Sequence, residues 1–167
     1  MMSRSLQMLT RYKAWADERV FSAIASLPEG EATKERGTRF GNIVHTLNHV
    51  FVIDSVFQAH LQGRPHHFGA RNTATHPPLS ELAQAVDALD RWSIDHVRTL
   101  SDDARAERIR FRFSGGGEGI MSREAMVLHV VNHAAYHRGM VAQMMYEVPA
   151  APPVTDLTVF LRDVAQG

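Results

Sequence analysis

The sequence predicts an all-α protein, a four-helix bundle with one long crossover connection and a short helix at its C-terminal end. Apolar residues recur at spacings of three and four along four long segments, which is the period of a helix with one buried face. A long irregular stretch separates the second segment from the third, and only one short segment alternates like a β-strand. Four amphipathic helices need a common core, and a bundle provides it.

The first helix is expected over about residues 5–27, where Pro28 ends it, and the second over about residues 40–61, before Gly63. Each segment carries a single apolar stripe, so each helix has one face to bury. The stripes are formed by Leu6, Leu9, Tyr12, Ala16, Phe21, Ile24 and Leu27 in the first segment and by Ile43, Leu47, Val50, Ile53, Phe57 and Leu61 in the second.

The irregular stretch, residues 64–78, has no helical period and is long for a compact domain, which is typical of a crossover connection or a functional loop. Ser80 is expected to cap the third helix, over about residues 80–100. Residues 108–113 then alternate apolar and charged side chains and lead into a run of glycines, which predicts a small hairpin. The hairpin is expected to present a solvated basic face formed by Arg108, Arg110 and Arg112.

Ser122 is expected to cap the fourth helix, which runs to about Tyr146. Prolines follow this helix, after which Thr155 and Asp156 open the short C-terminal helix. No repeat or low-complexity segment divides the chain. One domain over residues 1–167 is therefore expected, since the length is that of a single domain of ordinary size.

The composition excludes several classes of protein. Lys and Arg total 18, as do Asp and Glu, so the chain lacks the basic surplus of a nucleic-acid-binding protein. The absence of cysteine excludes disulfides, cysteine–zinc sites, iron–sulfur clusters and a thiolate nucleophile from the chain itself. A cytoplasmic location without membrane contact is expected, because no signal peptide and no stretch of about 20 apolar residues is present. The one unusual count is that of histidine, with 10 residues.

Five of the histidines are spaced four residues apart on two predicted helices. They are His45 and His49 on the second helix and His129, His133 and His137 on the fourth. Residues at this spacing project from nearly the same face of a helix. Side chains from two facing helices could therefore converge on one metal ion, and three imidazoles with open positions are typical of a catalytic site. Spacing alone leaves all five as candidate ligands.

Four segments resemble, in order, the motifs of one protein family. Residues 129–139 read HVVNHAAYHRG, which resembles the signature of the DinB/YfiT-like family of metalloenzymes. Residues 12–19 resemble the first-helix motif of this family, residues 40–49 followed by Asp54 its second-helix motif, and residues 152–157 its C-terminal motif. The resemblance extends over nearly the whole chain.

The resemblance implies a four-helix bundle with a long crossover, commonly assembled as a homodimer. It also implies one divalent metal ion held by His49, His133 and His137, with nickel or zinc as the first expectation and iron or manganese as the second. His45 and His129 match positions beside the ligands, and packing is the role expected of both.

Some relatives are thiol-dependent transferases or isomerases, and this is the first interpretation of the function. An ion on three neutral imidazoles can deprotonate a bound thiol, and a chain without cysteine must take a low-molecular-weight thiol and its small-molecule substrate from solution. The alternatives are a metal-dependent hydrolase, a non-catalytic metal-binding stress-response protein, and a dimeric scaffold that has lost its metal. Met140 keeps the last alternative open, because relatives often carry glutamine there.

The residues around the candidate ligands carry further expectations. Asp17, Asp54 and Asn132 could each accept the second N–H of a ligating imidazole, although a solvated or capping role is preferred for the two aspartates. On the fourth helix, Tyr136 is expected to pack in the core, Arg138 to form a surface ion pair, and Gly139 to allow a close helix approach. Core or dimer packing is expected of Met140, Met144 and Met145. The long loop could act as a lid, and its histidines are expected to be exposed to solvent; they are His66, His67 and His76.

Overall fold

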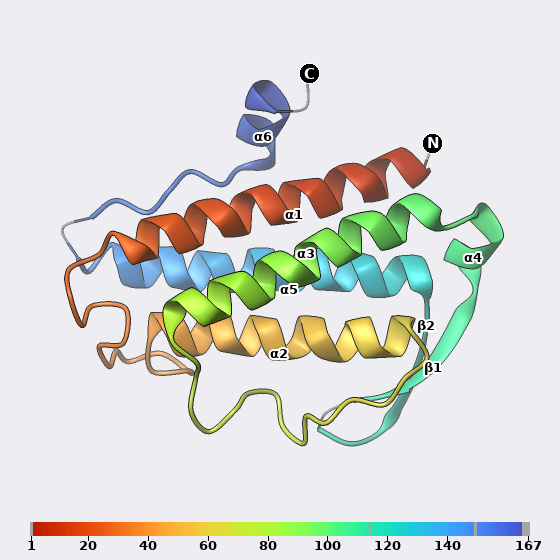
Figure 1. Cartoon of the computed structure of the whole chain (residues 1–167), viewed down its shortest axis with the longest axis horizontal. Helices are drawn as coiled ribbons and strands as arrows, with labels where there is room; N and C mark the ends of the chain where they lie inside the picture. Colours follow the sequence, from red (N-terminus) through yellow and green to blue (C-terminus); the bar gives the residue numbers. More distant parts are fainter. Residues whose placement is uncertain (1, 114, 149, 165–167) are drawn as a thin grey trace.

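The structure is a computed structural model that describes residues 2–113, 115–148 and 150–164. Four long helices lie side by side and form a bundle (Figure 1). They are α1 (Met2–Ala25), α2 (Ile43–Leu61), α3 (Leu79–Thr99) and α5 (Arg123–Met145). The other elements are α4 (Asp102–Ala106), the strands β1 (Arg108–Arg112) and β2 (Glu118–Ser122), and α6 (Leu157–Asp163). The predicted fold class is thus confirmed, including the short C-terminal helix.

Two helices of the bundle run in one direction and two in the other. In Figure 1, α1 and α5 run from right to left, whereas α2 and α3 run from left to right. Helices α1 and α2 each pack against both α3 and α5, so α1 and α2 lie diagonally across the bundle. Because α2 and α3 are parallel, the connection formed by residues 62–78 has to return along the length of the bundle. This connection is the predicted crossover.

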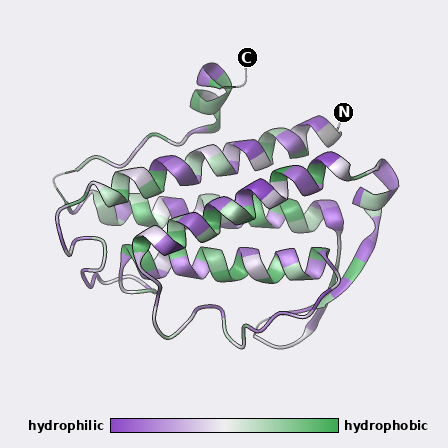
Figure 2. Ribbon diagram, viewed as in Figure 1, coloured by the Kyte–Doolittle hydropathy of each residue, from purple (hydrophilic) through white to green (hydrophobic). Residues whose placement is uncertain are grey.

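The core lies between the four long helices. Most residues of α2 are buried, and Figure 2 shows that this helix is apolar over much of its surface. One core cluster includes Phe21 and Met144, and a second includes Leu6 and Phe57 and extends to Phe111 of β1. Burial of a side chain such as Phe57 contributes about 1.5–3 kcal/mol. Although α2 is largely apolar, no helix in the described ranges is both long and apolar enough to cross a membrane.

Polar side chains at the helix ends determine where the helices begin. Ser122 caps α5 as predicted, since its hydroxyl accepts a hydrogen bond from the Ala125 amide at 3.1 Å. Asn42 caps α2 in the same way, accepting a hydrogen bond from the His45 amide at 2.8 Å. The second helix therefore begins at Ile43, a few residues later than predicted.

The prediction that Ser80 caps the third helix is wrong. Helix α3 begins one residue earlier, at Leu79, and the cap position is occupied by Pro78, which offers no side-chain acceptor. The start of this helix therefore has no side-chain cap hydrogen bond from its cap residue. Ser80 lies exposed in the first turn.

The short elements between α3 and α5 include the predicted hairpin. Strands β1 and β2 pair antiparallel, and the turn between them contains Gly116 and Gly117, whose positive φ angles of 91° and 88° favour glycine. Phe111 of β1 points inward and is buried. The expected basic face is confirmed by the exposed Arg108, Arg110 and Arg112. Helix α4 was not expected, because five residues are too few to show a helical period.

Candidate metal centre

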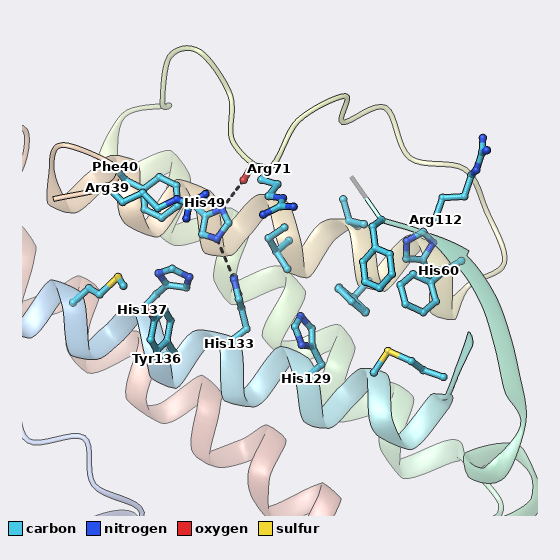
Figure 3. A pocket seen from close by; sticks show the side chains of 17 residues that line it. Arg39, Phe40, His49, His60, Arg71, Arg112, His129, His133, Tyr136 and His137 are labelled. Atoms are coloured by element: carbon cyan, nitrogen blue, oxygen red, sulfur yellow. Dashed lines mark hydrogen bonds between the residues drawn. The ribbon is translucent and has the colours of Figure 1, made fainter. Parts of the chain in front are cut away.

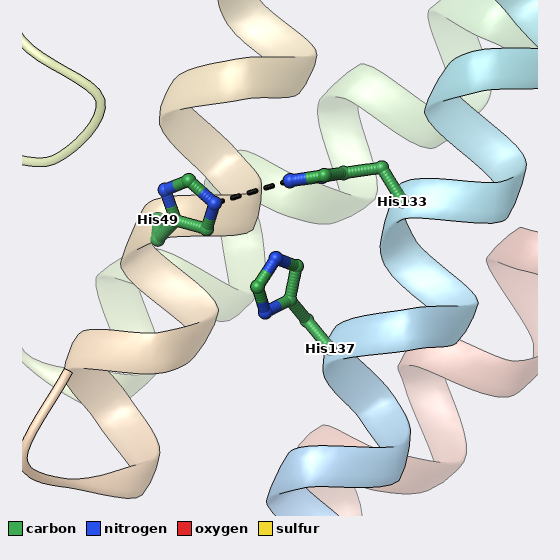
Figure 4. A group of neighbouring side chains, drawn as sticks. All are labelled: His49, His133 and His137. Carbon is green, nitrogen blue, oxygen red and sulfur yellow. Dashed lines mark hydrogen bonds between the residues drawn. The ribbon is translucent and has the colours of Figure 1, made fainter. Parts of the chain in front are cut away.

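Three histidines converge between α2 and α5. His49 projects from α2, and His133 and His137 project from α5, one turn apart (Figure 4). The ring nitrogens that they offer all lie within 4.8 Å of one another, and His49 Nε2 is 3.1 Å from His133 Nε2. Within the described ranges no other group of three histidine or carboxylate side chains is so arranged. The structure thus brings together the three histidines that the resemblance implies, which we call the triad.

The crossover loop fixes the orientation of the His49 ring. Its Nδ1 lies 2.6 Å from the backbone carbonyl of Arg71. A carbonyl can only accept a hydrogen bond, so Nδ1 carries the proton and Nε2 presents a lone pair toward His133. The Phe40 ring stacks on His49, with ring centroids 4.4 Å apart and an angle of 21° between the planes. His49 therefore has one nitrogen hydrogen-bonded and the other available to a ligand.

Further polar contacts hold the same loop against α2. His45 Nε2 donates a hydrogen bond to the carbonyl oxygen of Thr73 at 3.0 Å, and Asn48 donates to the side chains of Asn72 and Thr73. His45 therefore fastens the loop, a role beyond the packing that was expected of it. Of the three histidines expected to be exposed in this loop, His67 is exposed. His66 and His76 are half-buried instead.

The surroundings keep the three imidazoles neutral. Burial, and after it the proximity of His137 and His49, lowers the pKa of His133 to about 3. Burial and the proximity of His49 lower the pKa of His137 to about 4, and burial also lowers the pKa of His49. A neutral imidazole is the form that binds a metal ion, so near neutral pH no proton has to leave these rings.

The donor set fits a divalent ion. Two ring nitrogens that bind one zinc ion at about 2.1 Å lie about 3.0–3.4 Å apart, and the 3.1 Å between His49 and His133 falls in this range. The buried Nδ1 atoms of His133 and His137 have no hydrogen-bond partner among the described residues, so no contact in this part of the chain fixes the tautomer of either ring. Three imidazoles without a carboxylate suit zinc, nickel or iron better than magnesium, calcium or manganese.

A cavity of about 640 Å³ extends from the triad toward the hairpin (Figure 3). Its wall away from the triad is largely apolar and includes Phe57, Phe111, Phe113 and Met121. Three arginines line the cavity, and none of its described lining residues is Asp or Glu. The candidate centre is thus open on one side to an apolar chamber of a size that suits a small organic molecule.

Other residues of α5 also line this cavity. The His129 ring lies between the triad and the apolar wall, with its centroid 5.6 Å from that of His133 and 4.5 Å from that of Phe57. Tyr136 was expected in the core but lies exposed at the cavity edge, because its position on the helix turns it away from the bundle. Met140 is half-buried and adds apolar surface to the cavity lining.

The two aspartates proposed as partners of the ligands lie in an ionic cluster formed by Lys13, Asp17, Asp54, Asp90 and Arg138. Lys13 Nζ is 2.9 Å from Asp17 and from Asp54, and 2.6 Å from Asp90. All three carboxylates are buried, so the solvated or capping roles expected of Asp17 and Asp54 are wrong. Arg138 is buried as well and pairs with Asp17 at 3.2 Å, so the expected surface ion pair is also wrong. The cluster joins all four long helices.

Burial sets the charges of the ionic cluster. It raises the pKa of Asp54 to about 6 and that of Asp90 to about 7, although the nearby ammonium group of Lys13 acts in the opposite direction. For Lys13 itself, burial acts to lower the pKa, but the three carboxylates together raise it well above its usual value. Lys13 is therefore the permanent positive charge around which the carboxylates gather.

Three expectations concern residues outside the centre. Met144 and Met145 are buried in the core, as expected. A Cβ atom at Gly139 would meet no atom within 4 Å, so the expected close helix approach is wrong. Asn132 is exposed, which places it away from the buried ligands that it was considered to orient.

Sequence reasoning missed two features of this region. Arg71 orients His49 through a backbone carbonyl, and no side-chain pattern reveals such a contact. The ionic cluster did leave a signal, because Lys13 and Asp17 are four residues apart and fall in phase with the apolar stripe of the first helix. Charged residues on a stripe that must be buried predict an internal ion pair.

Comparisons with known proteins show the family of the chain and agree with its fold. A family model described as the DinB family matches residues 2–165. The chain is 25% identical over 158 residues to Protein DinB of Bacillus subtilis (strain 168), covering 92% of this chain and 91% of that protein. A solved structure of a DinB-like protein from Bacillus cereus ATCC 10987 superposes with a TM-score of 0.63 at 13% identity, over 83% of this chain and 89% of that chain. At this low identity the solved structure supports the fold alone.

Proposed function

The chain belongs to the DinB family, and from this premise we propose that it is a metal-dependent enzyme whose divalent ion is held by His49, His133 and His137. The observation that carries the proposal is the convergence of three neutral imidazoles at one end of an apolar cavity. Nickel and zinc are the first ions proposed, iron the next and manganese the last, since manganese prefers oxygen ligands. The bound ion would supply Lewis acidity toward a small thiol or a water molecule.

The open side of the centre supports catalysis over a purely structural or storage role. Structural metal sites are filled by protein ligands, whereas three ligands leave positions for a substrate. The free side of the triad faces a cavity of about 640 Å³. The chain's own residues prepare this site, because the Arg71 carbonyl holds the His49 ring in one tautomer and Phe40 restricts its rotation.

The reaction that we propose is a thiol-dependent transfer or isomerisation. Because the chain has no cysteine, a thiol nucleophile would enter with a low-molecular-weight cosubstrate. The alternative is a hydrolase, for which the same ion would supply hydroxide from water, since a divalent ion on three imidazoles needs no carboxylate base for this. The resemblance to thiol-dependent relatives and the lack of cysteine in the chain make the thiol reaction the first proposal.

Elemental analysis tests the metal site directly. Untagged protein, purified without nickel resin or chelator, is expected to contain about one divalent ion per chain, and His137→Ala is expected to lose it. His67→Ala is the matched control, because His67 is an exposed histidine in the crossover loop. If folded protein takes up no ion after incubation with zinc, nickel, iron and manganese in turn, the proposal is wrong.

A screen of small thiols against electrophilic acceptors tests the reaction. Loss of free thiol is expected only with the metal-loaded protein, and His137→Ala is expected to show the uncatalysed rate. The same preparations are assayed with activated esters in the absence of thiol. If the protein turns over esters and shows no dependence on any thiol, the proposed reaction is wrong and the hydrolase alternative is right.

The family resemblance extends the proposal to assembly and location. We propose a homodimer, for which light scattering would give about twice the 18.7 kDa of one chain. A molar mass of one chain at micromolar concentration would contradict this part of the proposal. A cytoplasmic location belongs to the same proposal, and cell fractionation tests it.

A further inference from the structure

Two arginines, Arg39 and Arg71, flank the triad (Figure 3). The Arg39 guanidinium lies 5.9 Å from the centre of the Phe40 ring, which stacks on His49. Arg71 is held beside the same histidine, because its carbonyl accepts the hydrogen bond from His49 Nδ1. Neither arginine has a carboxylate within ion-pair distance in the described part of the chain, and both line the cavity. The triad end of the cavity is therefore electropositive before any ion binds.

Arg71 also reaches from the triad to the hairpin. Its carbonyl bonds to His49, while its guanidinium reaches the hairpin turn, where Nη2 lies 2.7 Å from the position that a Cβ atom of Gly115 would take. Only glycine at this position lets the guanidinium approach so closely. Figure 3 shows Arg39 and Arg71 beside His49, whereas Arg112 points away from the cavity. Arg39 and Arg71 are thus the two charges presented to a molecule that enters.

The opposite wall consists mainly of phenylalanine rings, with the His60 ring 5.4 Å from that of Phe111. The rings of Phe57 and Phe111 have centroids 5.9 Å apart, and those of Phe111 and Phe113 are 4.8 Å apart. Gly119 makes room for this wall, since the Phe111 ring lies 2.6 Å from where a Cβ atom of Gly119 would stand. Such a wall binds an apolar or aromatic body.

We propose that this cavity binds an amphipathic organic carboxylate, with its acidic group between Arg39, Arg71 and the triad and its apolar body against the phenylalanine wall. The planar fork of a guanidinium matches a carboxylate, and a lining without Asp or Glu does not repel it. This assignment deepens the proposed function by naming the substrate class. Binding itself rests on the arginines and the aromatic wall, which are present with or without a metal ion.

Calorimetric titration with three probes tests the assignment. 4-Phenylbutyrate has both groups, 4-phenylbutan-1-ol lacks the charge, and butyrate lacks the ring. We expect the acid to bind about tenfold more tightly than the alcohol, as the loss of one charge-assisted hydrogen bond predicts. We expect the affinity of 4-phenylbutyrate to exceed that of butyrate by about tenfold or more, as burial of a phenyl ring predicts. Equal affinities for the acid and the alcohol would overturn the proposal.

Single variants locate the site. Arg39→Gln and Arg71→Gln are each expected to lower the affinity for 4-phenylbutyrate about fivefold to tenfold. The affinity for the alcohol is expected to stay unchanged, because only the acid carries the charge that the arginines bind. Arg110→Gln is the matched control, because Arg110 is an exposed arginine of β1 outside the cavity lining. Circular dichroism checks that each variant is folded. If all three variants lower the affinity for the acid equally, the assignment is wrong.

The same titrations separate this assignment from the metal proposal. Arginine-dependent binding of the acid to protein that takes up no metal would refute the metal centre and support the anion site. Normal metal uptake without binding of the acid would refute the anion site alone. Each titration is therefore run on the metal-free and on the zinc-loaded protein.

Discussion

Two polar clusters are buried in one bundle, and they differ in how far their members pair with one another. The ionic cluster draws residues from all four long helices, and its charges pair at 2.6–3.2 Å. The triad draws only on α2 and α5, its rings are neutral, and they line a cavity. The comparison teaches that a cluster of paired opposite charges holds the fold together, whereas neutral ligand atoms that converge beside a cavity mark where another molecule binds.

The largest effect is expected from removing the centre of the ionic cluster. Lys13→Met leaves the buried carboxylates of Asp54 and Asp90 without the cation they pair with, while Asp17 keeps Arg138. Breaking a buried ion pair in this way costs about 3–5 kcal/mol. A protein of this size would lose about 10 °C or more in Tm. Differential scanning calorimetry measures this, with Lys34→Met as control, because the Lys34 side chain is 61% exposed.

A double variant keeps this prediction decisive. Asp90→Asn added to Lys13→Met removes one of the stranded carboxylates and is expected to restore part of the lost stability. If Lys13→Met melts at the wild-type temperature, the cluster does not hold the helices together. The triad is expected to keep its metal in any of these variants that folds.

Metal loading is expected to stabilise the protein through the triad alone. A ligand that binds only the native state at 100 times its Kd adds about 2.7 kcal/mol, which raises the Tm by roughly 5–10 °C. His133→Ala is expected to abolish this shift while changing the Tm of the metal-free protein far less than Lys13→Met does. A thermal scan with and without zinc measures both. A zinc-induced shift that survives in His133→Ala would contradict the assignment of the ligands.

The two clusters are expected to oppose each other as the pH changes. The pKa values of His133 and His137 fall in the folded protein, so the unfolded chain binds more protons between about pH 4 and 6.5, and stability rises with pH in that window. The pKa values of Asp54 and Asp90 rise in the folded protein, so the folded chain binds more protons between about pH 4 and 7, and stability falls as the pH rises.

Urea titrations of the metal-free protein separate the two contributions. As the pH rises from 4.5 to 6.5, the free energy of unfolding of His133→Ala is expected to fall relative to that of the wild type. The reason is that the variant lacks the contribution of His133, which increases with pH. Asp90→Asn is expected to make stability rise over the same interval. Identical pH slopes in the wild type and both variants would show that neither cluster titrates as described.

The sequence predicted the bundle well because one period of 3.6 residues marks each long helix. The crossover followed from the length of residues 64–78, and α4 was missed because it is shorter than two turns. Helical spacing narrowed the candidate ligands to five histidines, and only the family motif selected three of them. The Arg71 carbonyl stayed hidden because its contact with His49 depends on the path of the loop and not on any side chain.

The smallest effect is expected at Gly139, which directly follows Arg138 on α5 and lies on the exposed face of the helix. Glycine inside a helix costs about 0.5–1 kcal/mol relative to alanine. A Cβ atom here would meet no atom within 4 Å, so Gly139→Ala is expected to stabilise the protein by about that amount. Calorimetry would show a Tm increase of about 2 °C with unchanged metal content. A decrease would mean that this face of α5 is covered in solution, and a second copy of the chain would then be the first partner to test.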